Sequence, residues 1–223
     1  MTTKLLLEKL RIDHKKFITR DEMIGYCKIF SVDYTTTIKY FIRKGYFIRI
    51  FKGIFYIRPF GHISSQNVMY DYMRLVSKGL YLKGIRNWYF GLNSALRLNK
   101  MTHEYFTVEY VISDSISRSS TMNIAAHKFK FKKMSKRLFN FGIVRKNGIR
   151  YSDAERTILD LMYFKKYEGF SEKRIISDIY EWSRGLSNRK LRDYSKHYPL
   201  SVQKMAGQLP TSKEGWLATG GTT

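Results

Sequence analysis

The chain has 223 residues and is strongly basic, with 41 Lys and Arg against 18 Asp and Glu and a formal net charge of +23. Its hydrophobic fraction of 43% supplies enough apolar side chains for a packed core. With 3 prolines, 15 glycines and no low-complexity tract, the composition excludes collagen-like, mucin-like and linker-like proteins. It predicts a folded chain of one large domain or two small ones.

The charge favours a nucleic-acid partner over a membrane. A net charge so far from zero destabilises the compact state by self-repulsion unless an anion compensates it. Basic residues run from Lys4 to Lys213, whereas a membrane surface selects a cationic face on one amphipathic helix. No window of about 18 apolar residues is present, and the leucine run at residues 5–7 is too short for a signal peptide. We therefore expect a cytoplasmic protein without membrane contact, in which Cys27 is a buried small hydrophobe.

Two short helices are predicted before residue 30. Residues 3–12 have helical apolar spacing. Their inward face is expected to hold Leu5, Leu6, Leu7, Leu10 and Ile12. After a short extended piece at residues 17–18, Thr19 and Glu22 form a capping box that opens a helix over residues 20–29. The inward residues of this second helix are expected to be Met23, Ile24 and Cys27.

A third helix and a β-hairpin follow. Asp33 is a suitable N-cap for a helix over residues 34–44, and Gly45 is suited to end it. The apolar face of this helix is expected to hold Ile38, Phe41 and Ile42. Residues 46–51 and 54–58 are β-prone runs around Lys52 and Gly53, which predicts a tight hairpin.

Helix, helix, turn, helix and hairpin within about sixty residues is the winged-helix order, in which the third helix enters the DNA major groove. The outward face of that helix and the hairpin carry hydroxyls and cations, which reach base edges and phosphates. The expected DNA-contacting residues are Thr35, Thr36, Lys39, Tyr40, Arg43, Lys44, Arg49, Lys52 and Arg58. Residues 1–60 hold 13 Lys and Arg against 5 Asp and Glu, a net charge of +8. The alternative is a small helical domain whose charges are an ordinary solvated surface.

A larger domain is expected over residues 61–207, followed by a loosely ordered tail over residues 208–223. Its first helix is predicted from an N-cap at Ser64 to about Lys78, and a second helix over residues 91–99. The residues that the first of these helices buries are expected to be Val68, Met69, Tyr72 and Val76.

From residue 105 the pattern becomes β-prone. One mostly antiparallel sheet is expected from strands over residues 105–113, 123–132, 139–144 and 149–151. The pair Asn147 and Gly148 predicts a hairpin turn between the last two strands.

Helices are predicted to complete the chain. A capping box over residues 152–155 opens the first of them, with Ile158, Leu159, Leu161 and Met162 inward. Three more helices are expected over residues 171–184, 188–198 and 200–207. The predicted fold class is therefore α+β: an N-terminal winged helix-turn-helix, then a larger α/β domain with a mostly antiparallel sheet and C-terminal helices.

Three segments together resemble the AbiEi family. They are residues 43–55 (RKGYFIRIFKGIF), residues 89–96 (YFGLNSAL) and residues 151–160 (YSDAERTILD), within a resemblance that covers about residues 5–207. Members are antitoxins and transcriptional regulators of type IV toxin–antitoxin systems of abortive infection. The resemblance implies a winged helix that binds operator DNA and represses its own operon, an antitoxin domain, and a nucleotidyltransferase-like toxin as partner. Some relatives regulate transcription without a toxin.

A second anionic contact is expected in the larger domain. Residues 115–152 contain no acid but many cations, and soluble surfaces normally intersperse both signs. The cations that we expect to make this contact are Lys128, Lys130, Lys132, Lys133, Lys136, Arg137, Arg145 and Lys146. Alternation places Lys128, Lys130 and Lys132 on one strand face and Phe129 and Phe131 on the other. Its partner is flanking DNA, RNA or an acidic protein; the alternative is a merely soluble surface.

No catalytic residue, metal site or cofactor is expected. Arg156 and Asp160 stand four apart on one helix, the spacing of an ordinary ion pair, and the 5 histidines show no metal-ligand spacing. The enzyme alternative is a metal-dependent nuclease in which Glu109 and Asp114 join Lys128 or Lys130, with the winged helix for targeting. A stand-alone architectural DNA-binding protein is the remaining alternative. The favoured hypothesis is a repressor that occludes a promoter, binding an operator that is an inverted repeat.

Overall fold

The computed structural model describes residues 2–59 and 71–210. Contacts divide the chain into two compact units, residues 1–86 with 122–128 and residues 87–121 with 129–223. The expected domain boundary between residues 60 and 61, and all but the first three residues of the expected tail, lie outside the described residues. The first unit contains the winged helix and the second most of a larger sheet and the C-terminal helices.

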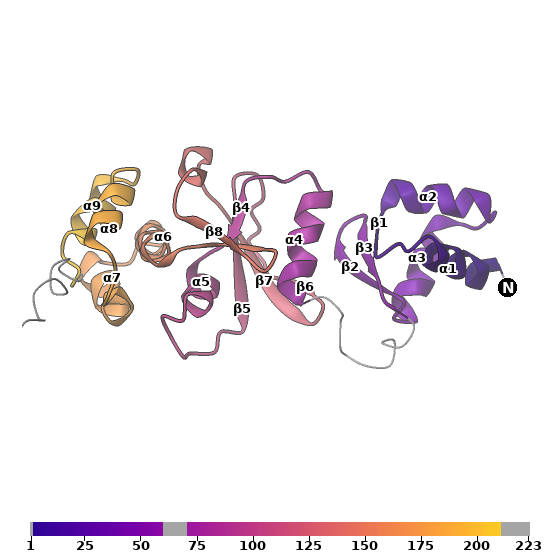
Figure 1. The fold of residues 1–223 in the computed structure, drawn as a ribbon, viewed down its shortest axis with the longest axis horizontal. Coiled ribbons are helices and arrows are strands. Elements are labelled where there is room, and N and C mark those ends of the chain that lie inside the picture. Colours follow the sequence, from indigo (N-terminus) through magenta and orange to yellow (C-terminus); the bar gives the residue numbers. More distant parts are fainter. Residues whose placement is uncertain (1, 60–70, 211–223) are drawn as a thin grey trace, which may run out of the picture. The chain divides into compact units, whose positions relative to one another are not determined.

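The first unit begins with the winged-helix order of elements (Figure 1). These elements are α1 (Thr2–Ile12), β1 (Phe17–Thr19), α2 (Arg20–Ile29), α3 (Tyr34–Arg43), β2 (Phe47–Phe51) and β3 (Ile54–Ile57). The three strands form a sheet in the order β1-β3-β2, and both pairings are antiparallel. The predicted helix-turn-helix and hairpin are thereby confirmed.

The local signals that start these helices are present as predicted. Thr19 is the N-cap of α2: its Oγ1 accepts from the Glu22 backbone N–H at 3.4 Å, and Glu22 Oε2 accepts from the Thr19 N–H at 2.9 Å. Asp33 caps α3 by accepting from the Thr36 N–H at 2.7 Å. These side chains satisfy amide groups that have no partner inside the helix.

The expected apolar face of α1 is only partly correct. Leu6, Leu7 and Leu10 are buried, but Leu5 is 50% exposed and Ile12 70% exposed. At 100° per residue, Leu5 and Ile12 fall together on the side of the helix that is nearly opposite the stripe formed by the other three leucines. A terminal helix that meets its domain along one stripe leaves the opposite side in solvent.

A further helix covers the second face of the small sheet. It is α4 (Tyr72–Leu82), whose N-cap Asp71 accepts from the Met73 N–H at 3.3 Å. The expected start at Ser64 and the expected burial of Val68 and Met69 lie outside the described residues. Val76 is fully buried and Tyr72 half-buried. Because the core of α1, α2 and α3 lies on the other face of this sheet, all four residues of β3 are buried.

The larger sheet has six strands and is mixed rather than wholly antiparallel. In spatial order they are β6 (Met122–Ile124), β7 (His127–Lys133), β5 (Val108–Ser113), β4 (Trp88–Phe90), β9 (Ile149–Ser152) and β8 (Ile143–Lys146). β4 pairs antiparallel with β5 and parallel with β9, while β8 and β9 form the expected antiparallel hairpin. The sequence prediction missed β4, because three consecutive buried aromatic residues show no alternation.

All four strands predicted for the larger sheet differ in their bounds. β5 begins at Val108 rather than at residue 105, and β9 ends one residue later than expected. The strand expected over residues 123–132 is divided into β6 and β7 at Ala125 and Ala126, whose φ angles are +50° and +65°. The strand expected from residue 139 begins at Ile143, after a 3₁₀ turn over Lys136–Phe139.

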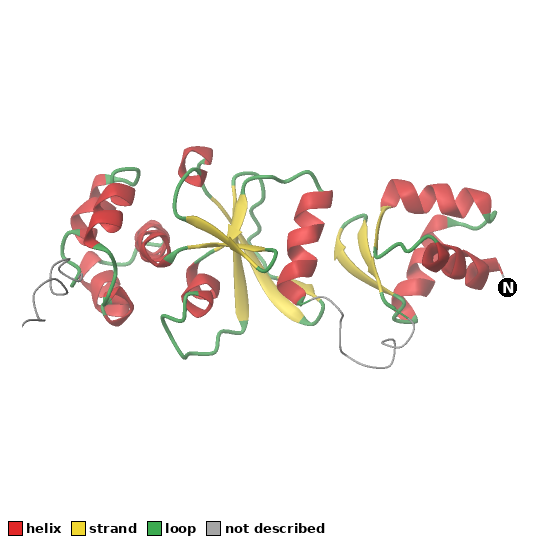
Figure 2. Ribbon diagram, in the orientation of Figure 1, coloured by secondary structure: helices red, strands yellow, loops and turns green. Residues whose placement is uncertain are grey.

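Helices complete the second unit. α5 (Leu92–Leu98) and α6 (Ala154–Tyr167) lie on the same side of the strands in Figure 2. The last helices are α7 (Glu172–Ile179), α8 (Asn188–Ser195) and α9 (Leu200–Ala206). The helix expected over residues 171–184 therefore ends early, and its last part is a separate 3₁₀ turn over Glu181–Ser183. Among the described residues, no helix is long and apolar enough to cross a membrane.

Candidate nucleic-acid interfaces

The outward face of α3 presents short hydroxyls and long cations. Thr35, Thr36, Lys39 and Arg43 are all exposed, and Ile38 and Phe41 are buried behind them. Positions 35, 39 and 43 are four residues apart, so their side chains stand on one face at intervals of about 6 Å along the axis. The helix itself contains no acid. This face is therefore exposed and basic, a surface that suits a polyanion.

Two of the expected α3 contacts also have structural roles. The Tyr40 ring is half-buried and packs on Phe41 and Tyr46, with centroid separations of 5.9 and 6.3 Å. The Thr36 backbone and side chain donate hydrogen bonds to Asp33, which lowers the pKa of that carboxyl. A hollow of about 390 Å³ lies beside this face, lined by Thr3, Thr36, Thr37, Lys39, Tyr40 and Arg43.

The hairpin holds its cations in different settings. Lys52 is exposed in the β2–β3 turn, which is anchored because the Arg20 N–H donates to the Gly53 carbonyl at 2.7 Å. Gly53 has a φ of +77°, a backbone conformation that residues other than glycine rarely adopt. Arg49 is exposed and its guanidinium lies 5.7 Å from the centre of the Phe55 ring.

Arg58 and Lys44 complete the expected DNA-contacting set. Arg58 follows β3 and is half-buried, and its backbone N–H donates to the Tyr46 carbonyl at 2.8 Å. Lys44 is the exposed C-cap of α3. All nine residues therefore belong to α3, the wing or the residues that adjoin them.

The expected second anionic contact is divided between the two units. Lys128 belongs to the first unit, and the other expected cations belong to the second. Strand β7 alternates as predicted, with Phe129 and Phe131 fully buried and Lys128 exposed. Lys133, Lys136, Arg137, Arg145 and Lys146 are exposed as well.

Residues 115–152 contain no acid, but an acid from elsewhere in the chain lies against them in the fold. Lys132 forms an ion pair with Glu168, the residue that follows α6, and its Nζ lies 4.8 Å from the centre of the Phe164 ring. Lys130 donates to the Ser119 carbonyl. Both lysines are half-buried, so part of the expected basic face serves to hold the unit together.

The end of β7 forms one wall of a cleft of about 840 Å³. The other walls are the loop after β5 and the last turns of α6. Its cations are Arg118, Lys130, Lys132, Lys133 and Lys136, and its aromatic residues are Phe131, Tyr163, Phe164 and Tyr167. The four lysines belong to the contact set expected from the sequence, whereas Arg118 and the aromatic wall on α6 do not. The sequence feature that could have predicted this wall is the spacing of Tyr163 and Tyr167, which places both residues on one helix face.

The ion pair of Arg156 and Asp160 is present but is not an ordinary one. Both side chains are fully buried, and Arg156 Nε lies 3.4 Å from Asp160 Oδ1. Tyr89 donates to Asp160 at 2.8 Å, Tyr198 donates to it at 2.5 Å, and Arg156 donates to the Phe141 carbonyl at 2.8 Å. Burial, the largest single effect, opposes the charged form of Arg156, but the Asp160 charge together with Tyr89 and Tyr198 outweighs it, so the pKa of Arg156 is raised. This network lies in the core of the second unit and holds four segments of the chain together.

The capping box expected over residues 152–155 is wrong in its residues. The N-cap of α6 is Asp153, which accepts from the Arg156 N–H at 3.0 Å, while Ser152 is buried at the end of β9. Glu155 accepts from the Ser187 N–H at 3.0 Å and so binds the start of α8 instead of the start of its own helix. Strand β9 continues one residue further than expected, which moves the cap from Ser152 to Asp153.

The structure does not bring together the carboxylates of the nuclease hypothesis. Glu109 is the second residue of β5, and Asp114 follows the last residue of that strand. Glu109 accepts from Ser94 and Arg97, both at 2.5 Å, and Asp114 accepts from Asn87 at 2.6 Å. Within the described ranges, no three His, Cys, Asp or Glu side chains are placed to hold a metal ion.

Comparison with known proteins adds a likeness in fold. No family model and no curated protein matches the chain. The crystal structure of the RV2827C protein from Mycobacterium tuberculosis is similar, with a TM-score of 0.61 over 92% of this chain and 74% of that chain. The two sequences are 11% identical, so the likeness concerns the fold.

Proposed function

We propose that this protein is a DNA-binding transcriptional repressor that acts as the antitoxin of a type IV toxin–antitoxin system and represses its own operon. One observation carries the DNA-binding part of the proposal. The exposed face of α3 bears Thr35, Lys39 and Arg43 in line, contains no acid and is backed by a packed core. A helix of this kind fits the major groove, which is about 12 Å wide.

The expected mechanism is occlusion of a promoter. Arg and Lys side chains on α3 meet guanine edges or phosphates, and the hydroxyls meet base edges or phosphates. Arg49, Lys52 and Arg58 supply phosphate contacts from the wing. A single α3 reads a short half-site, so high specificity requires two copies on an inverted repeat, either as a dimer or as two monomers.

The antitoxin part of the proposal rests on the resemblance to the AbiEi family in residues 43–55, 89–96 and 151–160. The partner implied is a nucleotidyltransferase-like toxin from a neighbouring gene. Co-expression with the product of a neighbouring nucleotidyltransferase-like reading frame tests this part. Growth arrest by that product alone, relieved by this chain, is the expected result; growth arrest that this chain does not relieve would contradict it.

The DNA-binding part is tested by the double variant Lys39→Ala/Arg43→Ala. We expect binding to the upstream region of its own gene to weaken by about 1–3 kcal/mol for each side chain that no longer reaches a base. Electrophoretic mobility shift or fluorescence anisotropy measures the change. The matched control is Lys173→Ala/Lys204→Ala, which removes the same charge from exposed positions on α7 and α9.

Equal affinities of the two double variants would show that α3 does not read the operator. An architectural DNA-binding protein is distinguished by competition with random duplex at raised salt, because its binding shows little preference for the operator. A nuclease is distinguished by incubation of the full chain with DNA and RNA in the presence of Mg²⁺ or Mn²⁺, where a repressor leaves both intact.

A further inference from the structure

The cleft at the end of β7 has walls that the chain holds in place. The Arg118 N–H donates to the Phe131 carbonyl at 3.1 Å, and Lys130 donates to the Ser119 carbonyl, so the loop after β5 is fastened to β7. The Met134 N–H donates to the Ser113 carbonyl at 2.9 Å. This bond joins the end of β5 to the residue that follows β7. The third wall is tied to β7 by the ion pair of Lys132 and Glu168.

The cleft has more positive than negative charges, and only some of its cations are paired. Its 5 cations face 2 carboxylates, Asp114 and Glu168, an excess of +3. Asp114 is engaged by Asn87 and by Ser115, and Glu168 by Lys132. Within the described part of the chain, Arg118, Lys133 and Lys136 have no ion-pair partner, and all three are exposed. The cleft therefore presents uncompensated positive charge.

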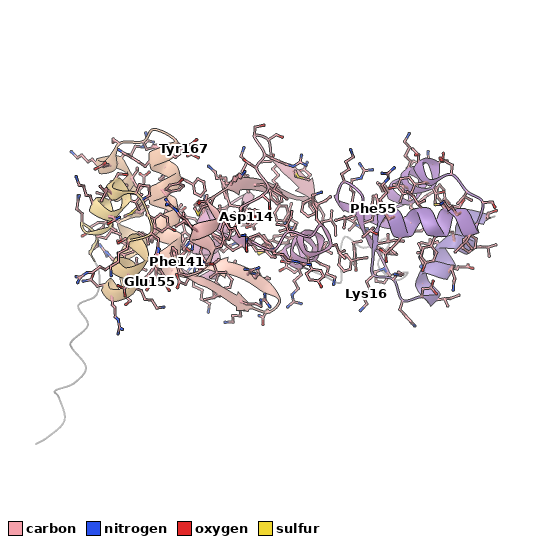
Figure 3. All side chains as sticks on the ribbon, turned by 90° about the horizontal axis from the view of Figure 1, so that it is seen from above. Lys16, Phe55, Asp114, Phe141, Glu155 and Tyr167 are labelled. Carbon is pink, nitrogen blue, oxygen red and sulfur yellow. The ribbon has the colours of Figure 1, made fainter. Side chains whose placement is uncertain are left out.

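The aromatic residues give the cleft a second property. Phe131 is fully buried and lines the cleft, and Tyr163 and Tyr167 stand one helical turn apart on α6. Tyr167 is 83% exposed; it and Asp114, both labelled in Figure 3, border the cleft. An exposed tyrosine beside free cations offers a ring face to a planar group and a charge to its phosphate.

We propose that this cleft binds an unpaired nucleotide, with its base against Tyr167 and Tyr163 and its phosphate at Arg118, Lys133 and Lys136. Bases in a duplex are stacked and paired and cannot meet these rings, so the ligand is either a free nucleotide or a residue of a single strand. A volume of about 840 Å³ lies within the range of ligand sites, about 300–1,000 Å³. The proposal goes beyond duplex binding by α3 and does not depend on it.

The test measures the binding of a short labelled single-stranded oligonucleotide to the full chain, with adenosine monophosphate and a base-free polyphosphate as competitors. Tyr167→Ala should weaken oligonucleotide binding about 5- to 150-fold, the range for loss of one base–aromatic stack. Tyr167→Phe keeps the ring and should bind as the unmodified chain does. Arg118→Ala/Lys136→Ala should weaken binding and flatten its salt dependence, by about 0.7 in logarithmic slope for each phosphate that is no longer neutralised.

Tyr105→Ala is the matched control, because Tyr105 is 84% exposed in the same unit but does not line the cleft. Equal binding by the Tyr167→Ala and Tyr105→Ala variants would overturn the proposal, as would polyphosphate competing as well as an oligonucleotide of equal charge. If the mononucleotide competes, the ligand is a free nucleotide. If it does not compete while oligonucleotide binding still depends on Tyr167, the ligand is a residue of a single strand. The Lys39→Ala/Arg43→Ala variant should retain this binding, which separates failure here from failure of the duplex interface.

Discussion

Arg156 is the largest fully buried side chain among the described residues, and it shows what single-residue patterns leave open. Spacing on the helix predicts its pairing with Asp160, because residues four apart share a face. Spacing does not show that both are buried or that Tyr89 and Tyr198 complete their hydrogen bonds. Those tyrosines are far away in sequence, so only the tertiary fold brings them to the pair. Burial, with the Asp160 charge as the second cause, raises the pKa of Tyr89 well above its usual value, so its hydroxyl stays protonated and donates.

Removing one partner of this pair should be costly. Arg156→Met leaves Asp160 charged in the core, and we expect the free energy of unfolding to fall by about 3–5 kcal/mol. Urea denaturation followed by circular dichroism measures the loss. Arg156→Met/Asp160→Leu removes both charges and should recover part of it.

The control for this prediction is Lys196→Met, which breaks an exposed pair with Asp193. Its effect should be much smaller than that of Arg156→Met, because water screens that pair. If Lys196→Met and Arg156→Met lower stability equally, the buried network contributes no more than a surface ion pair.

At the scale of elements, local rules predicted most helices and both tight hairpins. Capping, apolar spacing and turn residues act within a few positions, so Thr19, Asp33 and the pair Asn147 and Gly148 carry their signals in the sequence. How closely two elements approach depends on tertiary packing, which these local signals do not contain. Gly79 of α4 faces β2, and a Cβ atom there would lie 2.6 Å from Ile50 Cγ2 and 2.9 Å from Phe51 Cε2.

Two glycines in helices should therefore respond oppositely to alanine. Gly79→Ala should lower the free energy of unfolding by about 1–3 kcal/mol, because overpacking against β2 outweighs the gain in helix propensity. Gly25→Ala in α2 should raise it by about 0.5–1 kcal/mol, since no atom lies within 4 Å of the new Cβ. Thermal unfolding measures both variants. A stabilising Gly79→Ala would contradict the close approach of α4 and β2.

At the scale of the whole molecule, the net charge of +23 is the dominant electrostatic fact. The two proposed contact surfaces use part of it: α3 and the wing in the first unit and the β7 cleft in the second. Several other cations are compensated by exposed ion pairs, such as Lys165 with Asp178 and Lys166 with Glu172. Such pairs contribute little to stability, so self-repulsion persists in the absence of an anionic partner.

Salt should therefore stabilise the isolated protein. Raising the ionic strength from about 0.01 M to 0.15 M shortens the Debye length from about 30 Å to 8 Å and screens this repulsion. We expect the unfolding temperature to rise, and to rise less for Lys173→Glu/Lys204→Glu, which lowers the net charge. Differential scanning fluorimetry checks both. A fall in the unfolding temperature would mean that the screened ion pairs outweigh the repulsion.

By itself the sequence determined the winged helix, the hydroxyls and cations on the outward face of α3, and the basic character of the second unit. Each of these follows from periodicity, caps, turns or charge counted along the chain, which are properties of neighbouring residues. Only the tertiary structure decided the parallel pairing of β4 with β9, the buried setting of Arg156 and the aromatic wall of the cleft. These features join residues tens of positions apart, and the free energy of such contacts depends on burial and geometry that no local pattern contains.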